Sequence, residues 1–134
     1  MTTPFGPQLI GETEKTLVAL LRRSLAGTDL TEHQWVTIRL AGLLDGTVDD
    51  AGLVAAVADR AQFADAAELV EGVSARGLVA DGRLTAAGRA MLETVLERSD
   101  VVGATLWADF PADDVAATER TLNELHRRAR AALV

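Results

Sequence analysis

The chain has 134 residues, of which 49% are hydrophobic and 25% charged, and its 13 basic and 20 acidic side chains leave a formal net charge of −7. This length and composition suit one water-soluble domain with a hydrophobic core and exclude a largely disordered chain. The absence of cysteine excludes disulfides and thiolate chemistry. No apolar run is long enough to span a membrane and no signal peptide is evident, so we expect a cytoplasmic protein without a membrane partner.

Two helices are predicted near the N-terminus. Apolar residues at helical spacing predict the first over residues 10–25, and Gly27 ends it. The sequence Thr31-Glu32-His33-Gln34 matches a capping box, in which the threonine hydroxyl accepts a backbone N–H and the glutamine side chain reaches back. We therefore expect a second helix that begins here and runs to about Leu44.

Two shorter helices are predicted next. Asp45-Gly46 indicates a turn or helix stop, and Asp49 or Asp50 can cap a short third helix. A fourth helix is predicted from Ala64 to Arg76 and is terminated by Gly77. The residues expected to face inward are apolar: Leu53, Val54 and Val57 on the third helix, and Ala66, Leu69, Val70 and Val73 on the fourth.

A hairpin and two long helices complete the prediction. Short strands at 78–80 and 83–85 flank the two-residue turn Asp81-Gly82, and Thr85 can cap a long helix. The last helix follows Pro111, and its apolar residues alternate spacings of three and four: Val115, Thr118, Leu122, Leu125, Ala129 and Ala132. This seam requires a partner, which could be the first helix of the same chain, that of a second chain, or both.

Three short motifs follow one another along the chain: the stretch from Leu30 to Trp35 (LTEHQW), the stretch from Val73 to Val79 (VSARGLV) and the stretch from Arg83 to Ala90 (RLTAAGRA). In this order they resemble the MarR family of bacterial transcriptional regulators. The resemblance implies a homodimer held by its terminal helices, a recognition helix in the DNA major groove, a wing at the minor groove and, often, a small aromatic effector.

The expected fold is therefore mainly α with a minimal β-hairpin wing. We expect a single domain over 1–134, in which residues of about 28–88 form a winged helix-turn-helix lobe and residues 7–27 and 89–134 form the dimerisation helices. Physical reasons support the motifs independently, because Gly77 can adopt a left-handed conformation, Thr85 can cap a helix and Gly88 permits close packing.

The residues available for DNA contact depart from the family pattern. Those expected at the DNA are Arg60, Gln62, Asp65, Glu68 and Arg83. From Asp45 to Thr85 three arginines stand against eight carboxylates, a net charge of −5 that repels phosphate. Two hypotheses follow: a MarR-type regulator that binds double-stranded DNA as a dimer, or the same dimer without DNA binding, serving as a small-molecule, protein-interaction or enzymatic module.

An effector site is predicted near the start of the second helix. His33 and Trp35, approached by Trp107 and Phe110, could hold a flat apolar ligand with a polar handle. The alternative is that Trp35 belongs to the core and His33 is an exposed first-turn residue. No catalytic motif is found, and two distant histidines without cysteine predict neither a metal site nor a cofactor.

Overall fold

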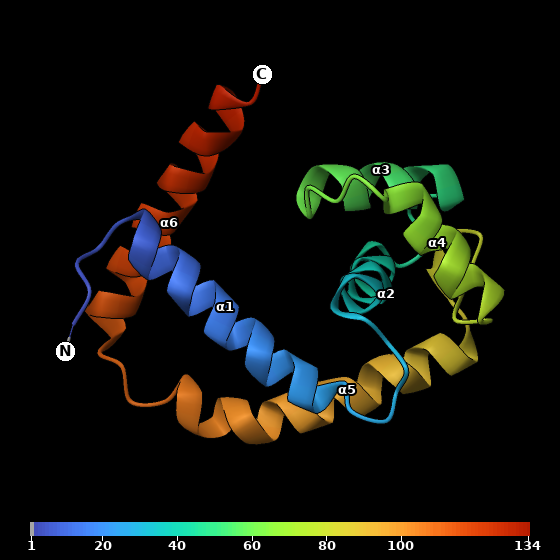
Figure 1. The fold of residues 1–134 in the computed structure, drawn as a ribbon, viewed down its shortest axis with the longest axis horizontal. Helices are drawn as coiled ribbons and strands as arrows, with labels where there is room; N and C mark the ends of the chain where they lie inside the picture. The colour runs from blue at the N-terminus through green and yellow to red at the C-terminus, as the bar shows by residue number, and fades with distance from the viewer. Residues whose placement is uncertain (1) are drawn as a thin grey trace. The chain divides into compact units, whose positions relative to one another are not determined.

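The computed structural model describes residues 2–134 and contains six helices and one small antiparallel sheet within them. The elements are α1 (Pro7–Ser24), α2 (Glu32–Leu44), α3 (Asp50–Arg60), α4 (Ala66–Ala75), β1 (Val79–Ala80), β2 (Arg83–Leu84), α5 (Ala86–Leu106) and α6 (Ala112–Ala132) (Figure 1). The predicted mainly helical fold with a small hairpin is thus confirmed. No helix among these residues combines the length and the apolar character needed to cross a membrane.

The chain divides into two compact units at Asp100, inside α5. The sequence predicts a single domain over 1–134, with helices 7–27 and 89–134 flanking the central lobe. The division arises because α6 buries none of its residues, whereas the preceding hundred residues contain every side chain of the hydrophobic core. We describe the two units separately.

The core of the first unit lies between α2, α3, α4, the hairpin and the first part of α5 (Figure 1). Ile38 of α2, Leu53 and Val57 of α3 and Val73 of α4 are fully buried, so each helix turns one apolar face inward. Trp35 joins them at 5% exposure. Burial of about 25 cal/mol per Å² of apolar surface makes this cluster the main stabilising contribution to the unit.

Local capping fixes where the helices begin. Thr31 accepts the backbone N–H of Gln34 at 3.1 Å while the Gln34 side chain accepts the Thr31 N–H at 3.0 Å, so the predicted capping box is present. The N-cap of α3 is Asp49, which accepts the Gly52 N–H. The fourth helix begins two residues later than predicted because Asp65 is its N-cap. The first helix also begins earlier than predicted, at Pro7, whose ring suits a first helical turn.

The hairpin is held against the start of α3. Asp81 and Gly82 have φ angles of 51° and 75°, the left-handed pair that a tight two-residue turn requires. The Gly82 N–H donates to Asp50 Oδ1 at 2.7 Å. A Cβ added at Gly82 would lie 2.7 Å from the Asp49 carbonyl oxygen, so the turn packs on the backbone of the α2–α3 loop.

Thr85 and Gly88 join the hairpin to α5. The Thr85 hydroxyl accepts the Gly88 N–H at 3.1 Å and itself donates to the Gly77 carbonyl. The start of α5 lies so close to β1 that a Cβ on Gly88 would overlap the Leu78 carbonyl oxygen. Both residues therefore act as the sequence predicted.

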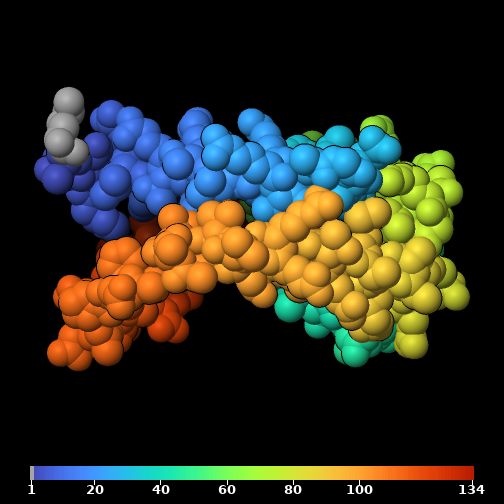
Figure 2. All heavy atoms as spheres, turned by 90° about the horizontal axis from the view of Figure 1, so that it is seen from below, coloured from blue at the N-terminus to red at the C-terminus, as the bar shows by residue number. Residues whose placement is uncertain are grey.

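Arg98 connects the end of α1 and the loop after it to α5. Arg98 of α5 donates to the carbonyl oxygens of Ser24 and Ala26 at 3.0 and 2.7 Å, which satisfies acceptors that the end of α1 leaves without helical partners. The side chains of α1 run alongside this part of α5 (Figure 2).

The second unit, Val101–Val134, contains the end of α5 and the whole of α6. On α6, Glu124 accepts hydrogen bonds from Arg127 at 2.6 and 2.8 Å and from Arg128 at 2.9 Å. These bonds, that of Arg127 first, lower the pKa of the Glu124 carboxyl from 4.5 to about 2. The apolar side chains of α6 remain exposed, with Val115 at 49% and Leu122 and Leu125 at 41% each.

Candidate nucleic-acid interface

Helices α3 and α4, joined by the short turn 61–65, form the part of the structure that corresponds to the predicted DNA-binding pair. Their core-facing residues hold them together, and the first turn of α4 has an exposed face. Arg60 lies exposed in the last turn of α3, and Gln62 and Asp65 follow in the turn. Four of the five predicted DNA contacts, Arg60, Gln62, Asp65 and Glu68, thus lie within nine residues at one helix junction.

Gln62 has a structural task at this junction. It adopts a left-handed backbone conformation with φ of 57°, and its side-chain amide donates to the Asp59 carbonyl at 2.6 Å. This bond caps the end of α3 and turns the chain toward α4. A DNA contact through Gln62 would have to use the remaining hydrogen-bonding capacity of its amide.

The exposed face of α4 is acidic. Asp65, Glu68 and Glu71 are all exposed, and Asp65 and Glu68 stand at the helix N-terminus. Carboxylates stabilise this end of a helix, because the backbone N–H groups carry partial positive charge there. The same carboxylates repel phosphate, so they stabilise the N-terminus of α4 but oppose its contact with a DNA backbone.

Two arginines near the ends of this region lie against other parts of the first unit. Arg76 donates to the carbonyl oxygens of Thr28 and Asp29, each at 3.0 Å, which fixes the α1–α2 loop against the end of α4. Arg83 follows the hairpin turn, and its guanidinium lies over Gly46. A Cβ added to Gly46 would be 2.6 Å from the Cζ of Arg83.

His33 connects α2 to the same junction. Its ring stacks on Phe63 with centroids 3.8 Å apart and planes inclined by 15°, and its Nδ1 lies 3.8 Å from Asp65 Oδ1. The sequence predicts His33, but not Phe63, as a residue of the site. The one local signal for Phe63 is that it is the large apolar residue of the turn before α4.

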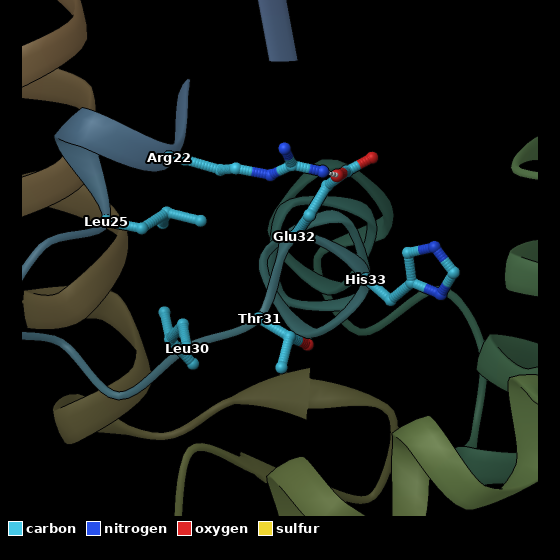
Figure 3. A pocket seen from close by; sticks show the side chains of 6 residues that line it. All are labelled: Arg22, Leu25, Leu30, Thr31, Glu32 and His33. Carbon is cyan, nitrogen blue, oxygen red and sulfur yellow. Dashed lines mark hydrogen bonds and ion pairs between the residues drawn. The ribbon is translucent and has the colours of Figure 1, made fainter. Parts of the chain in front are cut away.

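A shallow hollow of about 440 Å³ lies beside His33 (Figure 3). Its lining comes from the end of α1 and the start of α2: Arg22, Leu25, Leu30, Thr31, Glu32 and His33. Arg22 reaches across to Glu32 at 3.4 Å, and the two leucines supply the apolar wall (Figure 3). The hollow therefore offers an apolar surface with an ion pair at its edge, and the ring of His33 points away from the two leucines (Figure 3).

The other predicted ligand residues do not line this hollow. Trp35 packs in the core of the first unit. Trp107 and Phe110 belong to the second unit, where they are 67% and 61% exposed. Within residues 2–134 there is also no group of three histidine or acidic side chains able to hold a metal ion.

Comparisons with known proteins assign no relative to the chain. It matches no family model, no curated protein and no solved structure. The functional interpretation therefore depends on the chain's own residues and their arrangement.

Proposed function

We propose that the protein is a MarR-like winged helix-turn-helix regulator that binds double-stranded DNA as a homodimer, with α4 as the recognition helix and the β1–β2 hairpin as a reduced wing. The observation that carries this proposal is the order of packed elements: α3, a short turn, α4 with an exposed first turn, and a two-stranded hairpin directly after it. Helix-turn-helix proteins insert the second helix of such a pair into the major groove, with its first residues at the base edges.

The contacts available to α4 are few and favour base reading over phosphate binding. Arg60, in the last turn of α3, is the cation that precedes the recognition helix in the chain and is the proposed phosphate contact. Gln62, Asp65 and Glu68 face the bases, where a carboxylate can accept a hydrogen bond from the cytosine amino group. Arg83 contributes a charge at the hairpin, close to Gly46.

The second candidate function is the same dimer without DNA binding. The acidic face of α4 favours it, together with the engagement of Arg76 by backbone carbonyls. In both candidates the hollow beside His33 is the proposed site of a small aromatic effector, which would extend the stack that His33 forms with Phe63.

Fluorescence anisotropy against fragments of the source genome, with an unrelated duplex as control, separates the two candidates. DNA binding predicts tight binding to selected fragments and a shallow dependence on salt, because few phosphates are neutralised. Arg60→Ala should reduce the salt slope by about 1, the contribution of one phosphate contact, whereas Arg120→Ala on α6 should leave it unchanged. No binding at low salt by a folded dimer would remove the first candidate.

A gain-of-function variant tests the placement of α4. Replacing both Asp65 and Glu68 by arginine changes the local charge by four units at the proposed DNA surface and should raise affinity for any duplex. The same double reversal at Asp113 and Asp114, in the first turn of α6, is the matched control and should have a smaller effect. Equal effects from the two variants would contradict the assignment of α4 as the recognition helix.

A further inference from the structure

The chain contains the dipeptide Asp-Gly twice, at Asp45-Gly46 after α2 and at Asp81-Gly82 in the hairpin. In both, the aspartate and the glycine have left-handed backbone conformations, with φ of 42° and 75° in the first and 51° and 75° in the second. Each pair forms the centre of a tight turn, and the first turn is closed by the Thr47 N–H, which donates to the Leu44 carbonyl at 2.9 Å. Because sequence and backbone are alike, a difference in reactivity between the two sites has to come from their surroundings.

An Asp-Gly dipeptide can rearrange without a catalyst. The backbone nitrogen of the glycine attacks the side-chain Cγ of the aspartate, a bond forms between them, and a carboxyl oxygen leaves as water with the amide proton and a second proton. Water then opens the resulting succinimide ring at either carbonyl: one opening restores aspartate, and the other leaves isoaspartate, in which the main chain runs through the side-chain carbon atoms. Glycine favours the attack because no side chain crowds its nitrogen, and neighbouring groups in one chain react as a single molecule.

At Asp45-Gly46 both reacting groups are available. The Asp45 side chain is 78% exposed, and its ion-pair partner Arg89 lies 4.0 Å away, so the pair is a weak surface contact. Among residues 2–134 no acceptor receives a hydrogen bond from the Gly46 N–H. Neither the carboxyl group nor the nitrogen therefore has to leave a strong contact before the ring can close.

At Asp81-Gly82 the nitrogen is occupied. Gly82 is buried, and its N–H donates to Asp50 Oδ1 at 2.7 Å, a bond to a charged acceptor. The turn also packs on the α2–α3 loop, where a Cβ on Gly82 would lie 2.7 Å from the Asp49 carbonyl oxygen. Attack by this nitrogen would require the hydrogen bond to break and the hairpin to move away from the loop.

We propose that Asp45-Gly46 is a site of spontaneous isoaspartate formation in the native protein and that Asp81-Gly82 is protected. The modification adds one carbon atom to the backbone between α2 and α3 and alters the left-handed residue at which α2 ends. It falls where the guanidinium of Arg83 lies over Gly46, so the contact between the hairpin and the end of α2 changes with it. The reaction needs only water and is independent of DNA binding.

Ageing of the purified native protein at neutral pH tests the assignment. Trypsin releases the two sites on separate peptides, 40–60 and 77–83. Peptides with aspartate and isoaspartate have equal mass, but chromatography separates them and electron-transfer fragmentation identifies the extra backbone bond. Isoaspartate should accumulate at Asp45 at least about tenfold faster than at Asp81, the factor that loss of one hydrogen bond to a charged acceptor contributes. Equal rates, or a faster reaction at Asp81, would overturn the proposal.

A matched pair of asparagine variants, Asp45→Asn and Asp81→Asn, gives a second readout. Asparagine forms the same succinimide with loss of ammonia, so each reaction appears as a change in peptide mass. Asparagine also adopts the left-handed conformation readily, which preserves both turns. In the folded protein Asp45→Asn should lose its amide group, whereas Asp81→Asn should retain it at least about ten times longer. Retention of the amide in Asp45→Asn would also contradict the proposal.

The unfolded chain provides the control for neighbouring sequence. In urea both asparagine variants should lose their amide groups at similar rates, because glycine follows the asparagine in each. A difference that persisted in urea would arise from the flanking residues and would overturn the structural explanation. Adding Asp50→Ala to Asp81→Asn frees the Gly82 N–H and should accelerate the loss in the folded protein, and an unchanged rate would refute protection by this hydrogen bond.

Discussion

Replacing Gly88 by alanine is expected to destabilise the first unit, although alanine is the better helix former. A Cβ at this position would overlap the Leu78 carbonyl oxygen and lie 2.9 Å from the carbonyl carbon and 3.2 Å from Leu84 Cδ2. Two of these atoms belong to the backbone, so β1 and α5 would have to separate. Overpacking of this kind costs about 1–3 kcal/mol, and the gain in helix propensity offsets at most about 1 kcal/mol of it.

Gly72 on α4 is the matched control. It is also a helical glycine, but an added Cβ would meet only the Gln34 side-chain amide at 3.8 Å, an ordinary van der Waals distance. Gly72→Ala should therefore stabilise the protein by up to about 1 kcal/mol. The two identical substitutions are expected to change the free energy of unfolding in opposite directions.

Urea denaturation followed by tryptophan fluorescence measures both variants. Trp35 is 5% exposed and Trp107 is 67% exposed, so the change on unfolding reports mainly on the first unit. A Trp107→Phe background removes the second signal. If Gly88→Ala were as stable as Gly72→Ala, the close approach of α5 to β1 would be wrong, and with it the reason that glycine occupies this position.

Three further predictions follow from single contacts. Thr31→Ala should lower the free energy of unfolding by about 1 kcal/mol, because α2 loses its capping box, whereas Thr31→Ser should retain most of the stability. If urea denaturation gave the same loss for both variants, the capping role of Thr31 would be wrong. Asp50→Ala should accelerate amide hydrogen exchange at Gly82, because the Gly82 N–H loses its acceptor. An unchanged exchange rate in NMR would contradict the hydrogen bond between the hairpin and the start of α3. The Glu124 carboxyl should titrate near pH 2 in an NMR titration, because its pKa is lowered in the folded protein; the stabilisation of α6 by this carboxylate is therefore present above pH 4.5 and is lost as the pH falls toward 2. Arg127→Gln removes the largest cause of the lowered pKa, so the same titration of this variant should give a Glu124 pKa closer to 4.5.

The local structure could be predicted because its causes are local. The capping box of α2, the left-handed Asp81-Gly82 turn and the Thr85 cap each depend on residues within a few positions of one another. Gly88 was also predicted correctly, since a helix that follows a short hairpin closely leaves no room for a side chain at its first turn. Helix limits were less accurate, because α1 begins at Pro7 and α4 after Asp65, and the spacing of the apolar residues marks neither position.

The surroundings of the candidate site were decided only by the tertiary structure. Nothing in the spacing of Arg76 indicates that it bonds to Thr28 and Asp29, which lie about fifty residues earlier. The stack of His33 on Phe63 likewise joins residues thirty positions apart. Such contacts depend on how α2 and α4 pack against each other, and a periodic pattern of apolar residues determines which face packs but not which polar side chains then meet.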